Sequence, residues 1–366
     1  MLLRLTRLTG LLCLSLLVLI SCAGTPQVLA PEPKNIALIK EDIVSEPALN
    51  VSILTFNDKS RQNVNANKKV FPQVRAAEGE YLPFVLREAL VESGHWGAVR
   101  VVPDLDPTAE ILISAEILVS NAIELKLDVR AWDSTGQIWI DRTYEDWAID
   151  HSYRYDMKNL VEPFQDLFNK IANDLYMVRR VKTEKSLSNM LDTSMLRYAM
   201  ALSPKAFSEY LEIGDDGLII LAGLPARDDV MYERASKIRE AEYEFIDIVD
   251  EQYENFYKKM QLTYAYWRQY SYELIEYNKR IEQSGSTGRK KRQGSWEELD
   301  DIYKAYQESK MNEDELRELA ASFDAEITPT VTELEGTVIK LTGSLKSQYE
   351  EWRALLQKIY AQERGS

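Results

Sequence analysis

Residues 123–131 read IELKLDVRA, a strict alternation of apolar and charged side chains. A period of two predicts a β-strand with one face in a core and the other in water. The run before it, ILISAEILV at 111–119, is a second strand candidate, so the two runs predict a β-hairpin. The charged face of Lys126, Asp128 and Arg130 argues against a hairpin whose side chains meet lipid.

Hydrophobic periodicity on either side of this hairpin predicts the rest of a small domain. A polar loop follows the first predicted strand, and Gly94 stands where a helix C-terminal cap is expected. The predicted order is strand, helix, strand, hairpin, strand, helix, which gives a mixed α/β domain at 49–182. Outside the hairpin, the predicted elements are strands at 49–56, 98–102 and 137–144 and helices at 80–93 and 159–179.

Residues 133–139 read DSTGQIW and form a turn that leads into an aromatic strand. With the element order, this motif resembles the periplasmic domain of the curli-assembly lipoproteins and of the lipoprotein activators of penicillin-binding proteins. The resemblance covers about 100 of the 366 residues. It implies a non-catalytic part: a secretion-pore subunit, an export or flagellar accessory, or a peptidoglycan-synthase activator. The chain lacks the extra lipid-facing strand pair of the pore-forming members, which argues against a pore.

The N-terminal residues predict an export signal. Arg4 and Arg7 precede an apolar run at 11–20 that is shorter than the ~20 residues of a membrane span. The run ends in Leu19-Ile20-Ser21-Cys22, which resembles the lipobox of bacterial lipoproteins. That resemblance implies a signal peptide at 1–21, acylation of Cys22 and, because Ala23 follows, an anchor on the periplasmic face of the outer membrane. The alternative is an ordinary signal peptide with an incidental cysteine.

Residues 22–48 are predicted to be a lipidated tether. Three X-Pro steps favour extended backbone and exclude a long helix, which is typical of a semi-rigid spacer. A short apolar patch at 36–39 leaves an edge strand as the alternative.

Composition excludes several functions. The formal net charge is −15, from 59 acidic and 44 basic residues, which argues against a nucleic-acid partner. With only His95, His151, Cys13 and Cys22, the chain has neither a disulfide framework nor a Cys/His zinc site, and we expect no metal and no cofactor. Because His95 stands at a helix end, we interpret it as a packing or capping residue. The sequence contains no Gly-x-Ser-x-Gly and no His-Glu-x-x-His, so we expect no enzyme; a cell-wall or glycan enzyme with converging carboxylates stays as an alternative.

Residues 183–225 are predicted to be a connector with short helices and a buried strand at 218–222. After it, Asp228 or Asp229 caps a helix that meets no proline or glycine before Gly285. At 1.5 Å per residue, this helix is a rod of roughly 85 Å. The rod carries two stripes, so it needs two packing partners; we expect both to be later helices of this chain, with another protein as the alternative. The first stripe runs mostly in steps of three and four from Met231 to Ile281, and the second comprises Tyr243, Ile246, Tyr253, Tyr257 and Tyr264.

Capping signals divide the rest of a helical module at 226–364. Ser295-x-x-Glu298 and Asn312-x-x-Glu315 are capping boxes, and Thr328-Pro329 is typical of a helix start. The final predicted helix has apolar residues in steps of three and four from Val331 to Ile359. The module is therefore expected to be a long antiparallel coiled-coil hairpin that is locally three-helical.

The loop between these helices carries the densest basic run of an acidic chain. It comprises Arg289, Lys290, Lys291 and Arg292. We interpret it as a solvated loop, with contact to an acidic partner, phospholipid or lipopolysaccharide phosphate as the alternative.

The fold class predicted from sequence is thus a small mixed α/β domain followed by a long helical coiled-coil module. The predicted function is a non-catalytic outer-membrane lipoprotein, held by Cys22, that acts as a periplasmic scaffold or regulator of a cell-envelope assembly. Its expected partners are the membrane and an envelope protein. A subunit of an oligomeric export ring is the alternative, so homo-oligomerisation stays open.

Overall fold

The structure is a computed structural model that describes residues 35–41, 47–59, 72–148, 162–285, 330–334 and 337–362. The chain separates into Met1–Pro33 and Lys34–Ser366, and every described residue belongs to the second unit. Cys22, His151 and the basic run at 289–292 lie outside the described residues.

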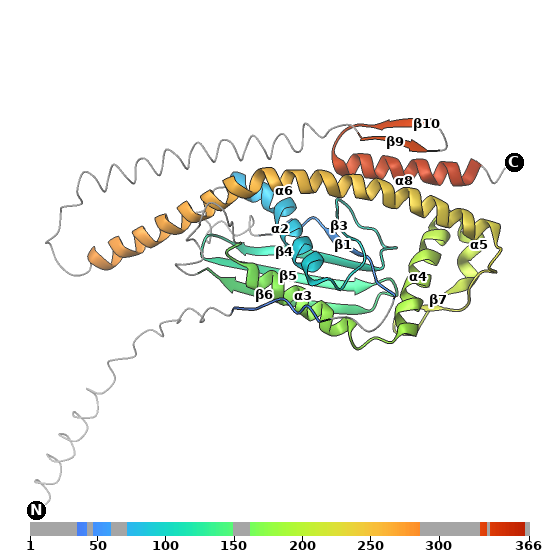
Figure 1. Ribbon diagram of the computed structural model, residues 1–366, viewed down its shortest axis with the longest axis horizontal. Coiled ribbons are helices and arrows are strands. Elements are labelled where there is room, and N and C mark those ends of the chain that lie inside the picture. Colours follow the sequence, from blue (N-terminus) through green and yellow to red (C-terminus); the bar gives the residue numbers. More distant parts are fainter. Residues whose placement is uncertain are drawn as a thin grey trace, which may run out of the picture. The chain divides into compact units, whose positions relative to one another are not determined.

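A six-stranded mixed sheet organises the α/β part, in the order β3-β1-β4-β5-β6, with β2 paired to β4 (Figure 1). Strand β1 pairs in parallel with β3 and β4, and β2 pairs in parallel with β4. Strands β4, β5 and β6 form an antiparallel meander. The predicted hairpin and its flanking strands are confirmed. The strands are β1 Val51–Leu54, β2 Asn57–Asp58, β3 Val99–Val102, β4 Ile111–Ser120, β5 Glu124–Asp133 and β6 Ile138–Trp147.

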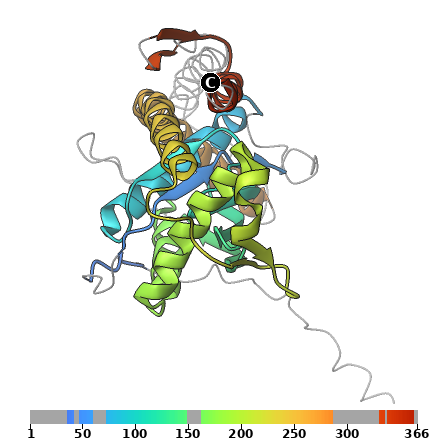
Figure 2. The same cartoon turned by 90° about the vertical axis from the view of Figure 1, so that its right-hand side faces the viewer.

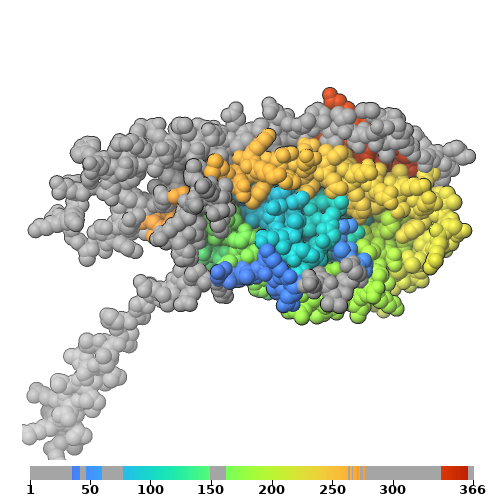
Figure 3. Space-filling model, viewed as in Figure 1, coloured from blue at the N-terminus to red at the C-terminus, as the bar shows by residue number. Residues whose placement is uncertain are grey.

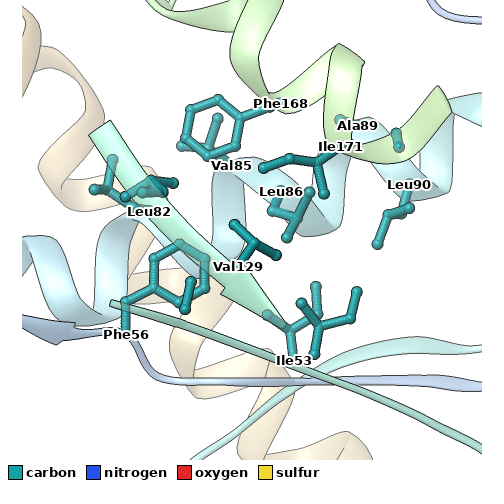
Figure 4. Close-up of a cluster of buried hydrophobic side chains, with 14 of the residues drawn as sticks. Ile53, Phe56, Leu82, Val85, Leu86, Ala89, Leu90, Val129, Phe168 and Ile171 are labelled. Carbon is teal, nitrogen blue, oxygen red and sulfur yellow. The ribbon is translucent and has the colours of Figure 1, made fainter. Parts of the chain in front are cut away.

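Strand β5 has the two faces that its alternation predicts. Its apolar side chains Leu125, Leu127 and Val129 are buried, and Arg130 on the other face is exposed. Two helices, α2 (Pro72–Ser93) and α3 (Gln165–Arg179), cover the apolar face. Figure 4 shows where they meet the sheet, with side chains from α2 and α3 over Ile53 and Val129.

Both of these helices differ from prediction at their starts. Helix α2 begins at Pro72 rather than at residue 80. The predicted start was late because Gly79 interrupts the apolar period, although the helix continues through it. A Cβ at Gly79 would lie 2.8 Å from the carbonyl oxygen of Phe56, so this position admits glycine only. Helix α3 begins at Gln165, so Pro163 precedes the helix instead of lying in its first turn. Gly94 follows α2 with a φ of +72°, as its predicted capping position requires.

The connector forms a small subdomain of helices and a hairpin. Its predicted strand is present as β8, but the expectation that it is buried was wrong: Ile220 is 50% exposed. The reason is that β8 pairs only with β7 in a two-stranded hairpin, of which one face packs on α4 through Leu221 while Ile220 lies on the other, exposed face. The elements are α4 Glu184–Leu202, α5 Pro204–Phe207, the 3₁₀ turn η3 Ser208–Tyr210, β7 Leu211–Ile213 and β8 Ile219–Leu221.

Helix α6 spans Val230–Gly285, 56 residues or roughly 84 Å, as the sequence predicts. Asp229 caps it by accepting a hydrogen bond from the backbone N–H of Tyr232 at 2.9 Å. Helix α8 (Leu345–Gln362) lies beside the first half of α6 (Figures 1 and 2). Tyr349 contacts Glu242 and Tyr360 contacts Met231, so the two helices are antiparallel, as predicted.

The predicted helix at 331–359 was wrong over its first third. Residues 330–341 form a hairpin of β9 (Thr330–Leu334) and β10 (Thr337–Leu341). Both strands begin Thr-Val and are rich in β-branched residues, which favour strands, and their apolar positions also fit a period of three and four. Gly343, at a φ of +102°, separates the hairpin from α8, and Ser344 Oγ caps that helix at the Ser347 N–H.

The partner predicted for the stripes of α6 was wrong in part. Helix α8 packs on the first half of α6, but the α/β part supplies the other partner through α2 and β3. Phe256, Met260, Tyr264 and Trp267 belong to the same buried cluster as the sheet. Figure 3 shows α6 lying directly against the surface of α2. Where the boundaries between domains fall stays a prediction.

Candidate functional site

Two buried arginines hold α6 on the α/β part and on α8. They are Arg239 and Arg268, which lie about 44 Å apart along the helix at 1.5 Å per residue. Because a buried charge is tolerated only when it is paired, each marks a point at which α6 is fixed to other elements. We define the contacts of these two arginines, with the β3 edge between them, as the α6 seat.

The first contact joins α6 to α2 and to the β4–β5 turn. Arg268 Nη2 lies 2.8 Å from Glu78 Oε1, and both side chains are 0% exposed. The same nitrogen donates to Ser120 Oγ at 2.8 Å, and Nη1 donates to the carbonyl oxygen of Asn121. Tyr264 donates its hydroxyl proton to Glu78 at 2.7 Å. Arg268 therefore links three segments that lie far apart in the sequence.

A further carboxyl, that of Glu162, lies in the same electrostatic environment. Burial raises the pKa of Glu162 to about 7, and the positive charge of Arg268 opposes this rise. The nearby carboxylates of Glu78 and Asp146 raise the pKa further. Glu162 is therefore partly protonated at neutral pH.

The second contact joins α6 to α8 and to the loop between β3 and β4. Arg239 Nη2 lies 3.2 Å from Asp106 Oδ2, and Arg353 of α8 lies 3.3 Å from Glu242 Oε1. Burial acts to lower the pKa of Arg239, but the carboxylates of Asp106 and Glu242 outweigh it and raise the pKa. Likewise, burial would raise the pKa of Asp106, but the positive charges of Arg239 and Arg353 outweigh it and lower the pKa. Tyr349 completes the network by donating to Glu242 at 3.3 Å.

Between Arg239 and Arg268, α6 covers the outer edge of β3. Asp250 Oδ1 accepts the backbone N–H of Val101 at 2.7 Å, and its other oxygen is 2.8 Å from Arg87 of α2. Asp247 pairs with Arg100 of β3. A free strand edge invites pairing with another chain, so these carboxylates protect the edge of β3.

The DSTGQIW turn is a structural feature of the fold. Asp133 accepts hydrogen bonds from the Thr135 N–H at 2.9 Å, the Gln137 N–H at 3.2 Å and the Trp139 indole N–H at 2.8 Å. Ser134 donates its hydroxyl to the carbonyl oxygen of Met190 in α4 at 2.6 Å. The motif that carried the sequence resemblance therefore fixes the β5–β6 turn and attaches α4 to it.

The site residues predicted from sequence and the α6 seat do not coincide. Cys22 and the run Arg289, Lys290, Lys291 and Arg292 lie outside the described residues, so their roles stay predictions. One feature of the sequence falls in the seat, because Glu242 interrupts the apolar stripe of α6, but by itself it indicates no site. Arg239 and Arg268 carried no signal of a site either, since arginine on a long helix is ordinary until its partners are known.

No three or more histidine, cysteine, aspartate or glutamate side chains within the described ranges are grouped to hold a metal ion. Of the helices that the structure describes, none combines the length and the hydropathy of a membrane span.

The likeness of this chain to known proteins is one of structure. No protein-family model matches it, and no curated protein matches it. Four solved chains match in structure. One is a PelC dodecamer from Paraburkholderia phytofirmans, at 14% identity over 36% of this chain and 93% of that chain, with a TM-score of 0.25. At this score the likeness carries no argument about function.

Proposed function

We propose that this chain is a non-catalytic envelope lipoprotein, anchored by Cys22 to the periplasmic face of the outer membrane, that acts as a scaffold. In this proposal, the α/β part supports α6 as a stiff arm that meets an envelope protein. The α6 seat is the observation that supports it most, because two buried ion networks hold α6 to the rest of the protein at points about 44 Å apart.

The outward face of α6 is the surface that this proposal assigns to a partner. Away from the seat, α6 has a row of exposed side chains at spacings of three, four and seven residues, mixed in charge and including the apolar Leu262. Positions three and four apart on a helix share one face, so the row is a single surface. Its members are Glu233, Lys237, Glu240, Glu244, Glu251, Asn255, Lys258 and Leu262.

Photo-crosslinking in cells tests the scaffold. A crosslinking amino acid is placed at Glu244, Asn255 or Leu262, with the exposed Glu209 of η3 as the matched control. We expect the same envelope protein to be captured from at least two of the α6 positions and not from Glu209. Capture of nothing from any α6 position would overturn the scaffold. Deletion of residues 226–364 is not a usable test, because α6 shares a buried core with α2 and the sheet, so the deletion would also disrupt the α/β part.

The lipid anchor has its own test. Intact mass measurement of the membrane fraction is expected to show cleavage before Cys22 and the added mass of acyl chains, and Cys22→Ala should release the protein from the membrane. An unmodified Cys22 in the mature chain would contradict the anchor while leaving the α6 seat untouched.

The export-ring alternative is decided by light scattering behind a sizing column. A monomer or dimer of the mature chain agrees with the scaffold proposal. A defined high-order oligomer would favour the ring. The PelC structure is a dodecamer, and its likeness to this chain is too slight to choose between the two outcomes.

A further inference from the structure

Residues 35–41, which belong to the predicted tether at 22–48, lie along α3 outside any helix or strand. The backbone of these residues is hydrogen-bonded to side chains of α3, and not to a neighbouring strand. Ile36 donates its N–H to Asp166 at 3.0 Å, and Asn169 donates to the Ile36 carbonyl at 2.7 Å. Asn173 accepts the Ile39 N–H at 2.9 Å and donates to the Ala37 carbonyl at 2.9 Å. The prediction of a plain spacer therefore does not hold for these residues, and they join no sheet edge either.

Side chains complete the docking of this segment, which we call the strap. Leu38 packs against the core cluster of the sheet. His95 lies 2.8 Å from the Ile39 carbonyl oxygen through Nε2 and stacks on the ring of Tyr176, with ring centroids 4.2 Å apart. Lys40 pairs with Glu92 at 2.7 Å, where both side chains are largely exposed.

The balance of these contacts favours reversible docking. The strap is held by helix side chains rather than by a backbone ladder, and Ile36, Leu38 and Ile39 are only half-buried. Ordering seven residues costs conformational entropy that a few hydrogen bonds of modest net strength only roughly offset. Opening of the strap is therefore expected well before the sheet opens.

We propose that the strap is a releasable latch that sets the length of the tether between the lipid anchor and the folded protein. The proposal rests on the anchor at Cys22. With the strap docked, the chain from residue 22 to residue 35 reaches about 45 Å at most. With the strap released, the first fixed point is Pro47, whose carbonyl oxygen accepts from Arg179 at 3.3 Å. The reach then becomes about 85 Å, so release roughly doubles the distance at which the protein can work from the membrane.

His95 lies between the strap and α3. Its ring faces Tyr176 and Arg179 of α3, and Ile39 and Glu41 of the strap. Burial and Arg179 lower the pKa of His95, whereas the Ile39 carbonyl and Glu41 raise it. The direct contacts of the strap therefore oppose the fall in the pKa of His95.

Amide hydrogen exchange on the full lipidated chain in detergent tests the latch. At pH 7.5, we expect the Ile36 and Ile39 amides to be protected, but less than those of β5. Asn173→Ala is expected to remove this protection without changing β5, and the exposed Asn255→Ala on α6 is the matched control. Protection of Ile36 and Ile39 that survives Asn173→Ala, or that equals the protection of β5, would overturn the latch.

The reach is measured on vesicles of phosphatidylethanolamine and phosphatidylglycerol. Energy transfer from a labelled headgroup to a dye at Lys237→Cys should fall when Asn173→Ala opens the latch. Unchanged transfer would contradict the longer reach. If the chain fails to stay on the vesicles because Cys22 is unmodified, the proposed anchor fails, while the exchange result still decides whether the strap opens.

Discussion

Asp133 shows how a conspicuous motif can be structural. Its carboxylate accepts four hydrogen bonds within its own turn, from two backbone N–H groups, the Thr135 hydroxyl and the Trp139 indole. The sequence analysis singled out these residues as a motif that resembles a known family, but it did not predict what Asp133 does in the fold. Only the spatial arrangement shows that Asp133 organises the β5–β6 turn.

Asp133→Ala is expected to lower the free energy of unfolding by about 2 kcal/mol, because it leaves the buried Trp139 indole N–H and the part-buried donors of Thr135 and Gln137 without this acceptor. Urea denaturation followed by circular dichroism measures the change. Asp141→Ala on β6 is the matched control: its carboxylate is 59% exposed, so its pair with Arg130 should contribute less than about 0.5 kcal/mol. Equal losses in the two variants would show that the turn is not fixed by Asp133.

Glu162 gives a pH prediction at the same scale. Because the pKa of Glu162 is raised to about 7, its contribution to stability is complete below its ordinary pKa of 4.5 and is lost as the pH rises through 7. Glu162→Gln should therefore raise the free energy of unfolding by about 3 kcal/mol at pH 8 and by less than about 1 kcal/mol at pH 5. Thermal unfolding at the two pH values checks this, and a gain that is the same at both would contradict it.

Among the elements, α6 combines what the sequence could and could not predict. Its start at Asp229, its length and its apolar stripes follow from capping and periodicity, and the structure confirms them. The identity of its packing partner depends on contacts such as that of Arg268 with Glu78, which are 190 residues apart. A periodic stripe shows that a partner exists, but not whether the partner is a helix or a sheet domain.

The hairpin of β9 and β10 illustrates a second limit of periodicity. Val331, Leu334, Val338 and Leu341 fit the spacing of a coiled coil, and the same residues belong to two short strands. Spacing over a dozen residues does not separate the two structures, whereas the β-branched composition favours strands.

The seat of α6 is tested by Arg239→Met. The variant leaves Arg353 as the ion-pair partner of the buried carboxylates of Asp106 and Glu242, so we expect a loss of about 3 kcal/mol. Chemical denaturation measures the loss, and adding Asp106→Asn should restore part of it because one unpaired charge is removed. The control is Lys237→Met, two residues away and 71% exposed, which should change little. A loss of similar size in the control would contradict the role of the ion network.

At the scale of the whole molecule, the sequence predicted the mixed α/β part, the long helix and its antiparallel neighbour. It did not predict that α6 shares a core with the sheet, nor that the strap docks on α3. Both depend on polar side chains, such as Arg268 and Asn173, whose burial or partners leave no periodic trace. The proposed scaffold depends on the first of these features and the proposed latch on the second.

Hydrogen exchange across the full chain under native conditions tests whether α6 is fixed to the α/β part. If so, the amides of α6 from Ala235 to Ser271 should open with the same free energy as those of β4 and β5, in a single cooperative step. Exchange of this part of α6 at a much lower opening free energy, with the sheet still protected, would show that the helix is only loosely attached and would contradict the account.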